Sequence, residues 1–215
     1  MKIVLSPRLE EALRLLPHPS VVYDVGADHG FFSLACSSLG DKVYAGENKK
    51  GPYQSLCKNL KEFPQYPVTP LFADGLDALP EDVHVICLLG MGGKTIAEIL
   101  LKDPKKLRNV DTILVEPQSQ ASLTISALEE LGYRNDEGKY VFEKRYYPLL
   151  RFRKGTKQLS QLERKYGEVP LKRKDPLLKE YLKRQLSYLL PFPEEKEKAK
   201  SIEEDLIAIY GEEEI

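Results

Sequence analysis

The chain of 215 residues has little cysteine and no long hydrophobic run, and each shortage excludes a class of protein. Its three cysteines are an odd number without C-x-x-C spacing, which predicts buried free thiols of a reducing compartment and not a disulfide framework. The longest apolar stretch, Val85 to Met91, is far shorter than the ~20 residues of a membrane-spanning helix. The segment Met1–Leu16 lacks the apolar region of a signal peptide. We therefore expect a cytoplasmic protein with no membrane partner.

Net charge is also nearly absent, because 32 Lys and Arg oppose 33 Asp and Glu. A neutral total by itself argues against a nucleic-acid partner, since Lys and Arg carry phosphate binding. The charges are unevenly distributed, however. Residues 151–190 hold twelve basic and four acidic side chains, a net of +8, whereas residues 191–215 hold three basic and nine acidic ones, a net of -6. This shift near residue 150 predicts a domain boundary and a basic segment that can bind phosphates.

Short apolar runs alternate with helical patterns over most of the first 131 residues. The expected strands are Val21–Gly26, Val43–Glu47, Pro67–Phe72, Val83–Leu89 and Thr112–Val115. Helical spacing follows at Phe31–Leu39, Pro52–Phe63, Thr95–Leu101 and Leu123–Leu131. Continuously apolar strands that alternate with helices are typical of a parallel sheet covered on both faces. We therefore predict an α/β fold with a doubly wound, mostly parallel sheet.

The pattern changes in the last third of the chain. Lys139–Glu143 and Tyr146–Phe152 are β-rich runs separated by two residues, and strands this close must pair antiparallel. Beyond Gly155, Asp175–Leu190 and Glu194–Tyr210 predict an antiparallel helical hairpin. The stripes expected to face each other are Leu178, Tyr181, Gln185 and Leu189 on one helix and Ala199, Ile202, Leu206 and Ile209 on the other. We place one domain at 1–155 and a C-terminal helical domain at 156–215.

The loop after the first strand carries acidic side chains. It reads Asp24-Val25-Gly26-Ala27-Asp28-His29-Gly30, which is not the G-x-G-x-x-G loop that cradles a pyrophosphate. Ligands of open parallel sheets bind at the carboxyl ends of the strands. Two carboxylates there repel a pyrophosphate but suit a cationic ligand, such as the α-ammonium and sulfonium groups of S-adenosylmethionine. An ordinary turn in which Asp28 caps the helix is the alternative.

Further candidate side chains follow the other strands. Glu47 can accept hydrogen bonds from ribose hydroxyls, and Asp74 in Asp74-Gly75-Leu76 can accept from an adenine amino group, although an exposed Glu and a turn Asp are commonplace. Three glycines in the run Gly90-Met91-Gly92-Gly93 favour close approach to a ligand or substrate. Glu116-Pro117-Gln118 ends the fifth strand. The last two loops are expected to flank the reacting atoms.

Several of these runs resemble one family, the bacterial tRNA (adenine-N1)-methyltransferases of the TrmK family, which modify adenine 22. The matching runs are Leu5-Ser6-Pro7-Arg8-Leu9, Asp24 to His29, Gly46-Glu47 leading to Lys50-Gly51-Pro52-Tyr53-Gln54-Ser55, Asp74-Gly75-Leu76 and Gly90-Met91-Gly92-Gly93. The resemblance spans essentially the whole chain. Two runs differ: Glu116-Pro117-Gln118 stands where the family has Gln-Pro-Asn, and Gly30-Phe31-Phe32-Ser33 stands where Ala-Tyr-Leu-Pro follows the family's Asp-His.

The resemblance implies a Rossmann-like class I methyltransferase fold with an antiparallel final hairpin, a coiled-coil-like C-terminal domain, S-adenosylmethionine as cofactor and tRNA as partner. The cofactor contacts that it implies are Arg8, Asp24, Gly26, Asp28, Glu47, Asn48, Asp74, Gly75, Leu76, Gly90 and Met91. The candidate catalytic residues are Asp28, His29 and Gln118. Asp28 is expected to stabilise the cationic product, and His29 to orient Asp28 or contact the substrate, a structural hydrogen bond being its alternative. No metal is expected, because His18 and His84 lack a Cys or carboxylate cluster.

The adenine N1 atom sets the requirements for the substrate site. It carries an in-plane lone pair, so positioning supplies most of the rate, and it lies on the Watson–Crick edge, so the base must be unpaired or extruded. Phe31, Phe32 and Tyr53 are candidates for stacking on that base, with core packing as the alternative. The substrate contacts are assigned to Gly92, Gly93, Tyr53, Arg151, Arg153 and Lys154, and the phosphate grip extends over Arg164, Lys165, Lys172, Arg173 and Lys174 unless these form a solvated helical face.

Two other functions stay open at this point. One is a methyltransferase that acts on a different RNA or on a small molecule, which Glu116 and Gln118 favour because they depart from the family's motif. The other is a non-catalytic RNA-binding protein that retains the fold. The sequence does not fix the oligomeric state, for which we expect a monomer.

Overall fold

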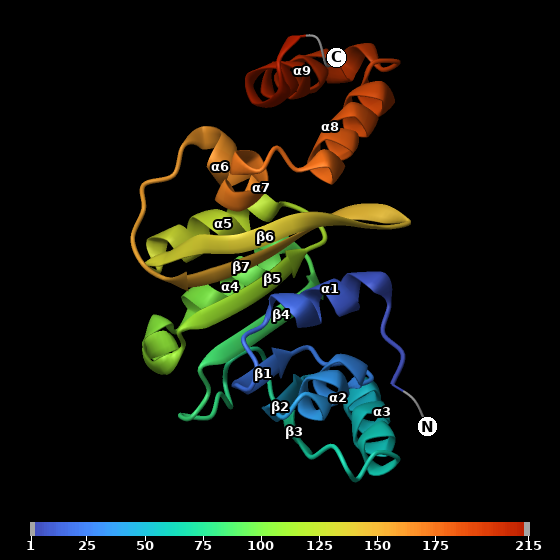
Figure 1. Ribbon diagram of the computed structural model, residues 1–215, viewed down its shortest axis with the longest axis vertical. Coiled ribbons are helices and arrows are strands. Elements are labelled where there is room, and N and C mark those ends of the chain that lie inside the picture. The colour runs from blue at the N-terminus through green and yellow to red at the C-terminus, as the bar shows by residue number, and fades with distance from the viewer. Residues whose placement is uncertain (1–2, 213–215) are drawn as a thin grey trace.

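A seven-stranded sheet forms the centre of the molecule in the computed structural model, which describes residues 3–212 (Figure 1). Its strands are β1 (Val21–Val25), β2 (Lys42–Glu47), β3 (Val68–Phe72), β4 (Val85–Met91), β5 (Thr112–Pro117), β6 (Tyr133–Glu143) and β7 (Arg145–Lys154). They lie in the order β3-β2-β1-β4-β5-β7-β6. The first five are parallel, and β7 is antiparallel to both β5 and β6. The predicted doubly wound sheet with an antiparallel final hairpin is therefore confirmed.

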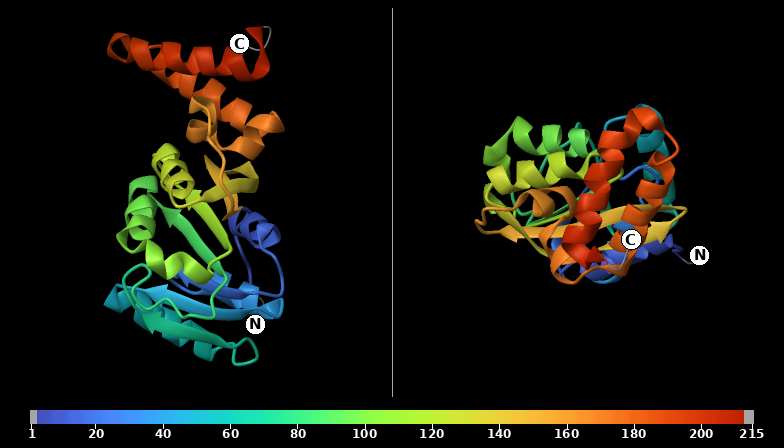
Figure 2. Two further views of the ribbon diagram at one scale, coloured as in Figure 1. Left: turned by 90° about the vertical axis from the view of Figure 1, so that its left-hand side faces the viewer. Right: turned by 90° about the horizontal axis from the view of Figure 1, so that it is seen from above.

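Helices cover both faces of this sheet. The helices that precede the final hairpin are α1 (Pro7–Leu15), α2 (Phe31–Ser38), α3 (Lys50–Lys61), α4 (Gly93–Lys102), the 3-10 helix η1 (Pro104–Asn109) and α5 (Ala121–Glu130). Figure 2 shows α1 on the opposite face from α4 and α5. In β1, Val22 packs with Ala12 and Phe32 on one face, whereas Tyr23 packs with Ile96 and its neighbours on the other. Both faces of β1 are thus buried, which explains why every residue of β1 except Asp24 is apolar or aromatic.

The chain after the sheet forms a helical unit that packs against β6. Its elements are α6 (Gln161–Tyr166), α7 (Glu168–Lys172), α8 (Pro176–Leu189), the 3-10 helix η2 (Pro193–Glu195) and α9 (Lys196–Tyr210). The predicted hairpin corresponds to α8 and α9. The sequence patterns did not predict α6 and α7, although Ser160 and Glu163 form a complete capping box at the start of α6.

The stripe predicted for the helical hairpin is partly wrong on α8. The buried residues of α8 are Leu178, Leu182 and Leu186, which pack with Ala199, Leu206 and Ile209 of α9. The predicted Tyr181 and Leu189 pack against the edge of this core, whereas Gln185 lines a cavity, as Tyr181 also does. Two adjacent stripes at helical spacing run along α8, and the wholly apolar one packs against α9 because it buries no polar atom.

Three further sequence predictions concern the cysteines, metal binding and membrane crossing. The thiols of Cys36 and Cys87 are free and buried, Cys57 is free and half-buried, and burial raises the pKa of Cys36 and Cys87. Within residues 3–212, no cluster of His, Cys, Asp or Glu side chains is arranged to hold a metal ion. In the same part of the chain, no helix combines the length and the apolar character that a membrane crossing requires.

Candidate functional site

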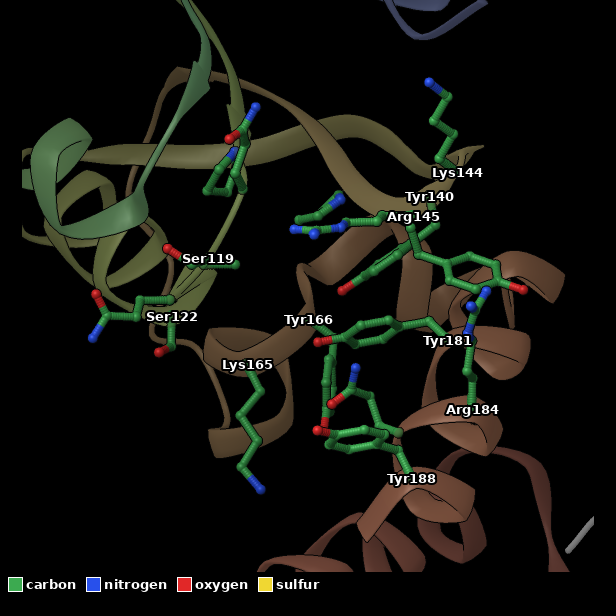
Figure 3. Close-up of a pocket in the computed structure, with 17 residues that line it drawn as sticks. Ser119, Ser122, Tyr140, Lys144, Arg145, Lys165, Tyr166, Tyr181, Arg184 and Tyr188 are labelled. Atoms are coloured by element: carbon green, nitrogen blue, oxygen red, sulfur yellow. The ribbon is translucent and has the colours of Figure 1, made fainter.

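Three cavities lie next to one another along the carboxyl edge of the sheet. The acidic cavity, of about 600 Å³, opens between the ends of β1, β2 and β4 and is lined by Asp28, Glu47 and Asp74. The Arg8 cavity, of about 370 Å³, shares Gly26 and Asp28 with the acidic cavity. The tyrosine cavity, of about 680 Å³, shares Gln118 with the Arg8 cavity and reaches to α8 (Figure 3). The Arg8 cavity therefore adjoins both the acidic cavity and the tyrosine cavity.

The end of β1 presents a buried carboxyl group, and the loop after it an exposed one. Asp24 is buried, accepts a hydrogen bond from Ser33 Oγ at 2.6 Å, and has its pKa raised to about 6 by burial. Asp28 has a φ of +49° and its side chain is 63% exposed, with His29 Nε2 at 3.7 Å from its Oδ2. Helix α2 begins after Gly30 and has no side-chain cap. Asp28 is thus open to both cavities, and its capping of α2 is excluded.

The acidic cavity collects the polar groups predicted after β2 and β3. Glu47 is buried at the end of β2 and accepts from the Lys49 backbone N–H at 2.9 Å. Asn48 Nδ2 donates to Asp74 Oδ1 at 2.8 Å, which holds the exposed Asp74 at the rim. Gly26, Gly75 and Met91 complete the predicted set that lines this cavity. Leu76 belongs to the buried core and does not line it, so the side chain of Leu76 is not placed for the predicted ligand contact.

The glycines at the end of β4 and directly after it occur for two different structural reasons. Gly90 has a φ of +74° and lines the Arg8 cavity, as a residue close to a ligand should. Gly93 instead touches the neighbouring loop: its N–H donates to Ser119 O at 2.7 Å, and an added Cβ would overlap the carbonyl oxygen of Gln120. Gly92 and Gly93 line none of the three cavities. The contact that requires a glycine at position 93 is therefore with the protein itself.

Arg8 links the N-terminal helix to the end of β5. Its guanidinium pairs with Glu116, lies 5.4 Å from the Tyr147 ring centroid, and is 19% exposed. Glu116 is fully buried, and its Oε1 atom has no hydrogen-bond partner among the described residues. Burial raises the pKa of Glu116 to about 7, although Arg8 favours the charged form. A Cβ on Gly90 would lie 3.8 Å from Arg8 Nη1, so Arg8 borders the cavity while its charge faces Glu116.

Two of the three aromatic candidates, Phe31 and Phe32, line the Arg8 cavity, and Tyr53 does not. Phe31 is 39% exposed and lines the Arg8 cavity beside His29, with ring centroids 6.5 Å apart. The side chain of Phe32 is 5% exposed and belongs to the core. Tyr53 is half-buried, packs edge-on against Phe72 and lines none of the three cavities. Phe32 therefore packs mainly in the core and also borders the cavity, and its stacking on a base stays a prediction.

The basic residues at the end of β7 lie away from the three cavities. Arg153 pairs with Thr112 in the sheet, and Arg151 with Leu114, so this end of β7 lies beside the beginning of β5. Arg151 forms a two-fold hydrogen-bonded pair with Asp136, and Lys154 bonds to the Arg108 carbonyl. Substrate contact by Arg151, Arg153 and Lys154 stays a prediction, and the structure brings none of them to the site.

Other cations of the basic segment also have acidic partners. Arg164 pairs with Glu129, Lys165 with Asp205, Lys172 with Glu168 and Arg173 with Glu137. The cations that line the tyrosine cavity, besides Lys165, are Lys144, Arg145 and Arg184. Sequence reasoning missed these three. The sequence contained a signal for Lys144 and Arg145. They lie at the predicted turn between the last two strands, and a final strand antiparallel to β5 begins at the carboxyl edge of the sheet.

The chain matches known proteins in both sequence and structure. A family model described as a methyltransferase domain matches residues 5–150. The curated tRNA (adenine(22)-N(1))-methyltransferase of Bacillus subtilis (strain 168) is 28% identical over 126 residues, which are 56% of this chain and 52% of the relative. The match thus spans about half the length of that relative.

Two solved structures are similar over nearly the whole chain. A protein of the NADB-Rossmann superfamily from Streptococcus agalactiae is 29% identical, with a TM-score of 0.87 and 97% of both chains covered. A candidate tRNA (m1A22) methyltransferase from Streptococcus pneumoniae, in complex with S-adenosyl-L-methionine, is 27% identical, with a TM-score of 0.88, 94% of this chain and 100% of that chain covered. These relatives confirm the fold class and the resemblance that the motifs indicate.

Proposed function

Because this chain belongs to the methyltransferase domain family, we propose that it transfers a methyl group from S-adenosylmethionine to N1 of an adenine in tRNA, at position 22, in the cytoplasm. One observation carries the proposal: Asp28 opens on two adjoining cavities, one acidic and one bordered by Phe31 and Gln118. We assign residues 1–155 to binding of the cofactor and the target base, and residues 156–215 to a helical domain that extends the tRNA surface.

The acidic cavity supports S-adenosylmethionine as the cofactor. This ligand carries an ammonium group, a sulfonium, two ribose hydroxyls and an adenine amino group, all of which favour carboxylate neighbours. Glu47 would accept from the ribose hydroxyls and Asp74 from the adenine amino group, while Gly26 and Asp28 would border the methionine portion. Its volume of about 600 Å³ lies within the range of small-molecule sites. When bound, the cofactor supplies the methyl group.

The Arg8 cavity supports a flat base as the acceptor. Phe31 offers an exposed ring for stacking, and Gln118 offers an amide that can hydrogen-bond to a base edge. Adenine N1 needs no deprotonation before it attacks, and methylation leaves a positive charge on the ring. The Asp28 carboxylate would stabilise that charge as it develops, with His29 beside it at 3.7 Å. Positioning and one carboxylate therefore supply the chemistry.

Replacement of Asp28 tests this role. Asparagine tolerates the positive φ of +49° at this position, so Asp28→Asn removes the charge with little backbone strain. We expect kcat for tRNA methylation to fall about 100-fold, as when one transition-state contact is lost, while the affinity for S-adenosylmethionine by calorimetry stays within a few-fold. Glu81→Gln, at an exposed position outside the cavities, is the matched control. Activity retained by Asp28→Asn would show that the assigned role is wrong.

Two measurements decide between this function and its alternatives. Mass spectrometry of tRNA nucleosides after reaction identifies the methylated atom, and absence of 1-methyladenosine with label in another product would favour a different substrate. Glu116, in place of the family's Gln, is the observation that favours that alternative. Calorimetry without any S-adenosylmethionine binding would instead indicate a non-catalytic RNA-binding protein.

A further inference from the structure

The tyrosine cavity lies where the helical unit meets the carboxyl edge of the sheet. One wall is formed by the loop after β5, which carries Ser119, and the start of α5, which carries Ser122. The other wall is formed by β6, β7, α6 and α8. Figure 3 shows the rings of Tyr140 and Tyr181 and the guanidinium of Arg145 projecting into the space between these walls. Gln118 joins this cavity to the Arg8 cavity. A polymer whose one unit enters the Arg8 cavity thus finds a second site directly beside it.

In the part of the chain that the structure describes, three of the four cations that line the tyrosine cavity lack the carboxylate partners that several cations of the basic segment have. No carboxylate within residues 3–212 forms an ion pair with Lys144, Arg145 or Arg184, whereas Arg164, Lys172 and Arg173 are paired. The three side chains are exposed at the cavity mouth. Arg184 hydrogen-bonds to Tyr146, and Lys144 lies near Glu143, but none of the three is held in a direct ion pair with a described residue, so their positive charge is available to an anionic ligand.

Aromatic side chains alternate with these cations. Tyr181, Arg184 and Tyr188 lie three and four residues apart on α8 and so share one stripe of the helix. The Tyr188 side chain is 68% exposed, and Tyr181 is half-buried with its ring centroid 5.7 Å from that of Tyr140. Among the described residues, the hydroxyls of Tyr140, Tyr181 and Tyr188 have no hydrogen-bond partner. Tyr140 belongs to the buried cluster that α8 and α9 share, and Tyr181 packs against it, whereas Tyr188 lies outside that cluster and is not required for the packing.

We propose that the tyrosine cavity binds an unstacked nucleotide next to the target adenine of the RNA, with its base on Tyr181 and Tyr188 and its phosphate at Arg145 and Arg184. Base stacking on tyrosine with phosphate contacts from Arg is the usual chemistry of single-stranded RNA sites. This proposal rests on the proposed function, because it assigns the base in the Arg8 cavity to the same strand. Holding a neighbouring base out of the stack would help to extrude the target from its helix.

Four variants and a direct binding assay test the proposal. Tyr188→Ala and Tyr181→Leu remove one ring each, Arg145→Ala removes one cation, and Arg108→Ala is the matched control, since Arg108 is exposed and paired with Glu81 at the opposite edge. Anisotropy of a labelled single-stranded oligoribonucleotide gives Kd at several salt concentrations. Methyl transfer to tRNA gives KM and kcat, and circular dichroism checks that each variant folds.

We expect each ring removal to raise both the oligoribonucleotide Kd and the KM for tRNA at least about fivefold, with kcat nearly unchanged. Arg145→Ala should reduce the slope of log Kd against log salt by about 0.7, the loss of one phosphate contact. Arg108→Ala should match the wild type. If folded Tyr188→Ala and Arg145→Ala both retain Kd and KM within twofold, or if the wild type does not bind the oligoribonucleotide, the proposal is wrong.

The same experiment separates this proposal from the proposed function. A wild-type protein that binds the oligoribonucleotide through these side chains but transfers no methyl group to tRNA would overturn the function and support the nucleotide site. A wild-type protein that methylates tRNA with all variants unaffected would support the function and overturn the nucleotide site. Equal weakening of binding to polyglutamate and to RNA by Arg145→Ala, without any effect of Tyr188→Ala, would indicate a general anion surface and would also overturn it.

Discussion

The buried carboxyl of Glu116 makes the stability of this fold depend on pH. Burial raises the pKa of Glu116 from its ordinary value of 4.5 to about 7 in the folded protein. Between these values the folded state holds a proton that the unfolded chain releases. The free energy of unfolding is therefore highest below pH 4.5, as far as this group is concerned, and falls as the pH rises to about 7. At about 1.4 kcal/mol per pH unit, the full contribution is about 3 kcal/mol.

Glu116→Gln removes this titration and keeps the shape of the side chain. The amide can still accept a hydrogen bond from Arg8, so the variant tests charge more than packing. Urea unfolding at pH 5 and at pH 8 measures the free energy of unfolding of both proteins. From the linkage relation, the wild type should lose about 2–3 kcal/mol more than the variant between these two conditions.

Groups common to both proteins cancel in this comparison. Asp24, whose pKa burial raises to about 6, titrates in the wild type and in Glu116→Gln alike. Two unfolding free energies that fall in parallel would refute the reasoning, since they would mean that Glu116 is ionised throughout and that Arg8 fully compensates its burial.

Two further substitutions probe how the site is held. Gly93→Ala should lower kcat/KM for methyl transfer by more than tenfold, because the new methyl group would overlap the carbonyl of Gln120 and displace the loop that carries Gln118. An unchanged kcat/KM would contradict this. Asp175→Ala should reduce the free energy of unfolding in urea by about 2–3 kcal/mol, because Asp175 caps α8 and also accepts from the Tyr140 N–H at 2.9 Å; Asp175→Asn, which keeps the cap, should lose less.

Local patterns predicted the sheet because its strands are buried on both faces. The run Val85–Leu89 is continuously apolar, Val21–Val25 is interrupted only by Asp24, and the short separation of Glu143 from Tyr146 left only an antiparallel hairpin. The carboxyl edge then followed from the parallel order. Asp28, Glu47 and Asp74 could be grouped because each follows a strand, and the structure places all three around one cavity.

Contacts between distant parts of the chain were not predictable in this way. Arg8 meets Glu116 across 108 positions, and no periodicity indicates which cation a buried carboxylate will pair with. Gly93 illustrates the same limit, because its neighbour is the backbone of Gln120 in another loop. On α8, the pattern could not decide which of two adjacent stripes packs against α9, since Tyr181 and Leu182 are both apolar enough to be buried.

The basic segment shows why a charge count is a poor guide to a binding surface. A helical unit that packs on a neighbouring domain brings its Lys and Arg side chains to that domain's carboxylates, as Arg164 does to Glu129 and Arg173 to Glu137. Those charges are neutralised within the protein, so they add little to the potential that an RNA phosphate meets. Arg145 and Arg184 lie in no such pair. The charge that an RNA phosphate can meet is therefore the part that is not paired within the protein, and Arg145 and Arg184 place some of that charge at the tyrosine cavity.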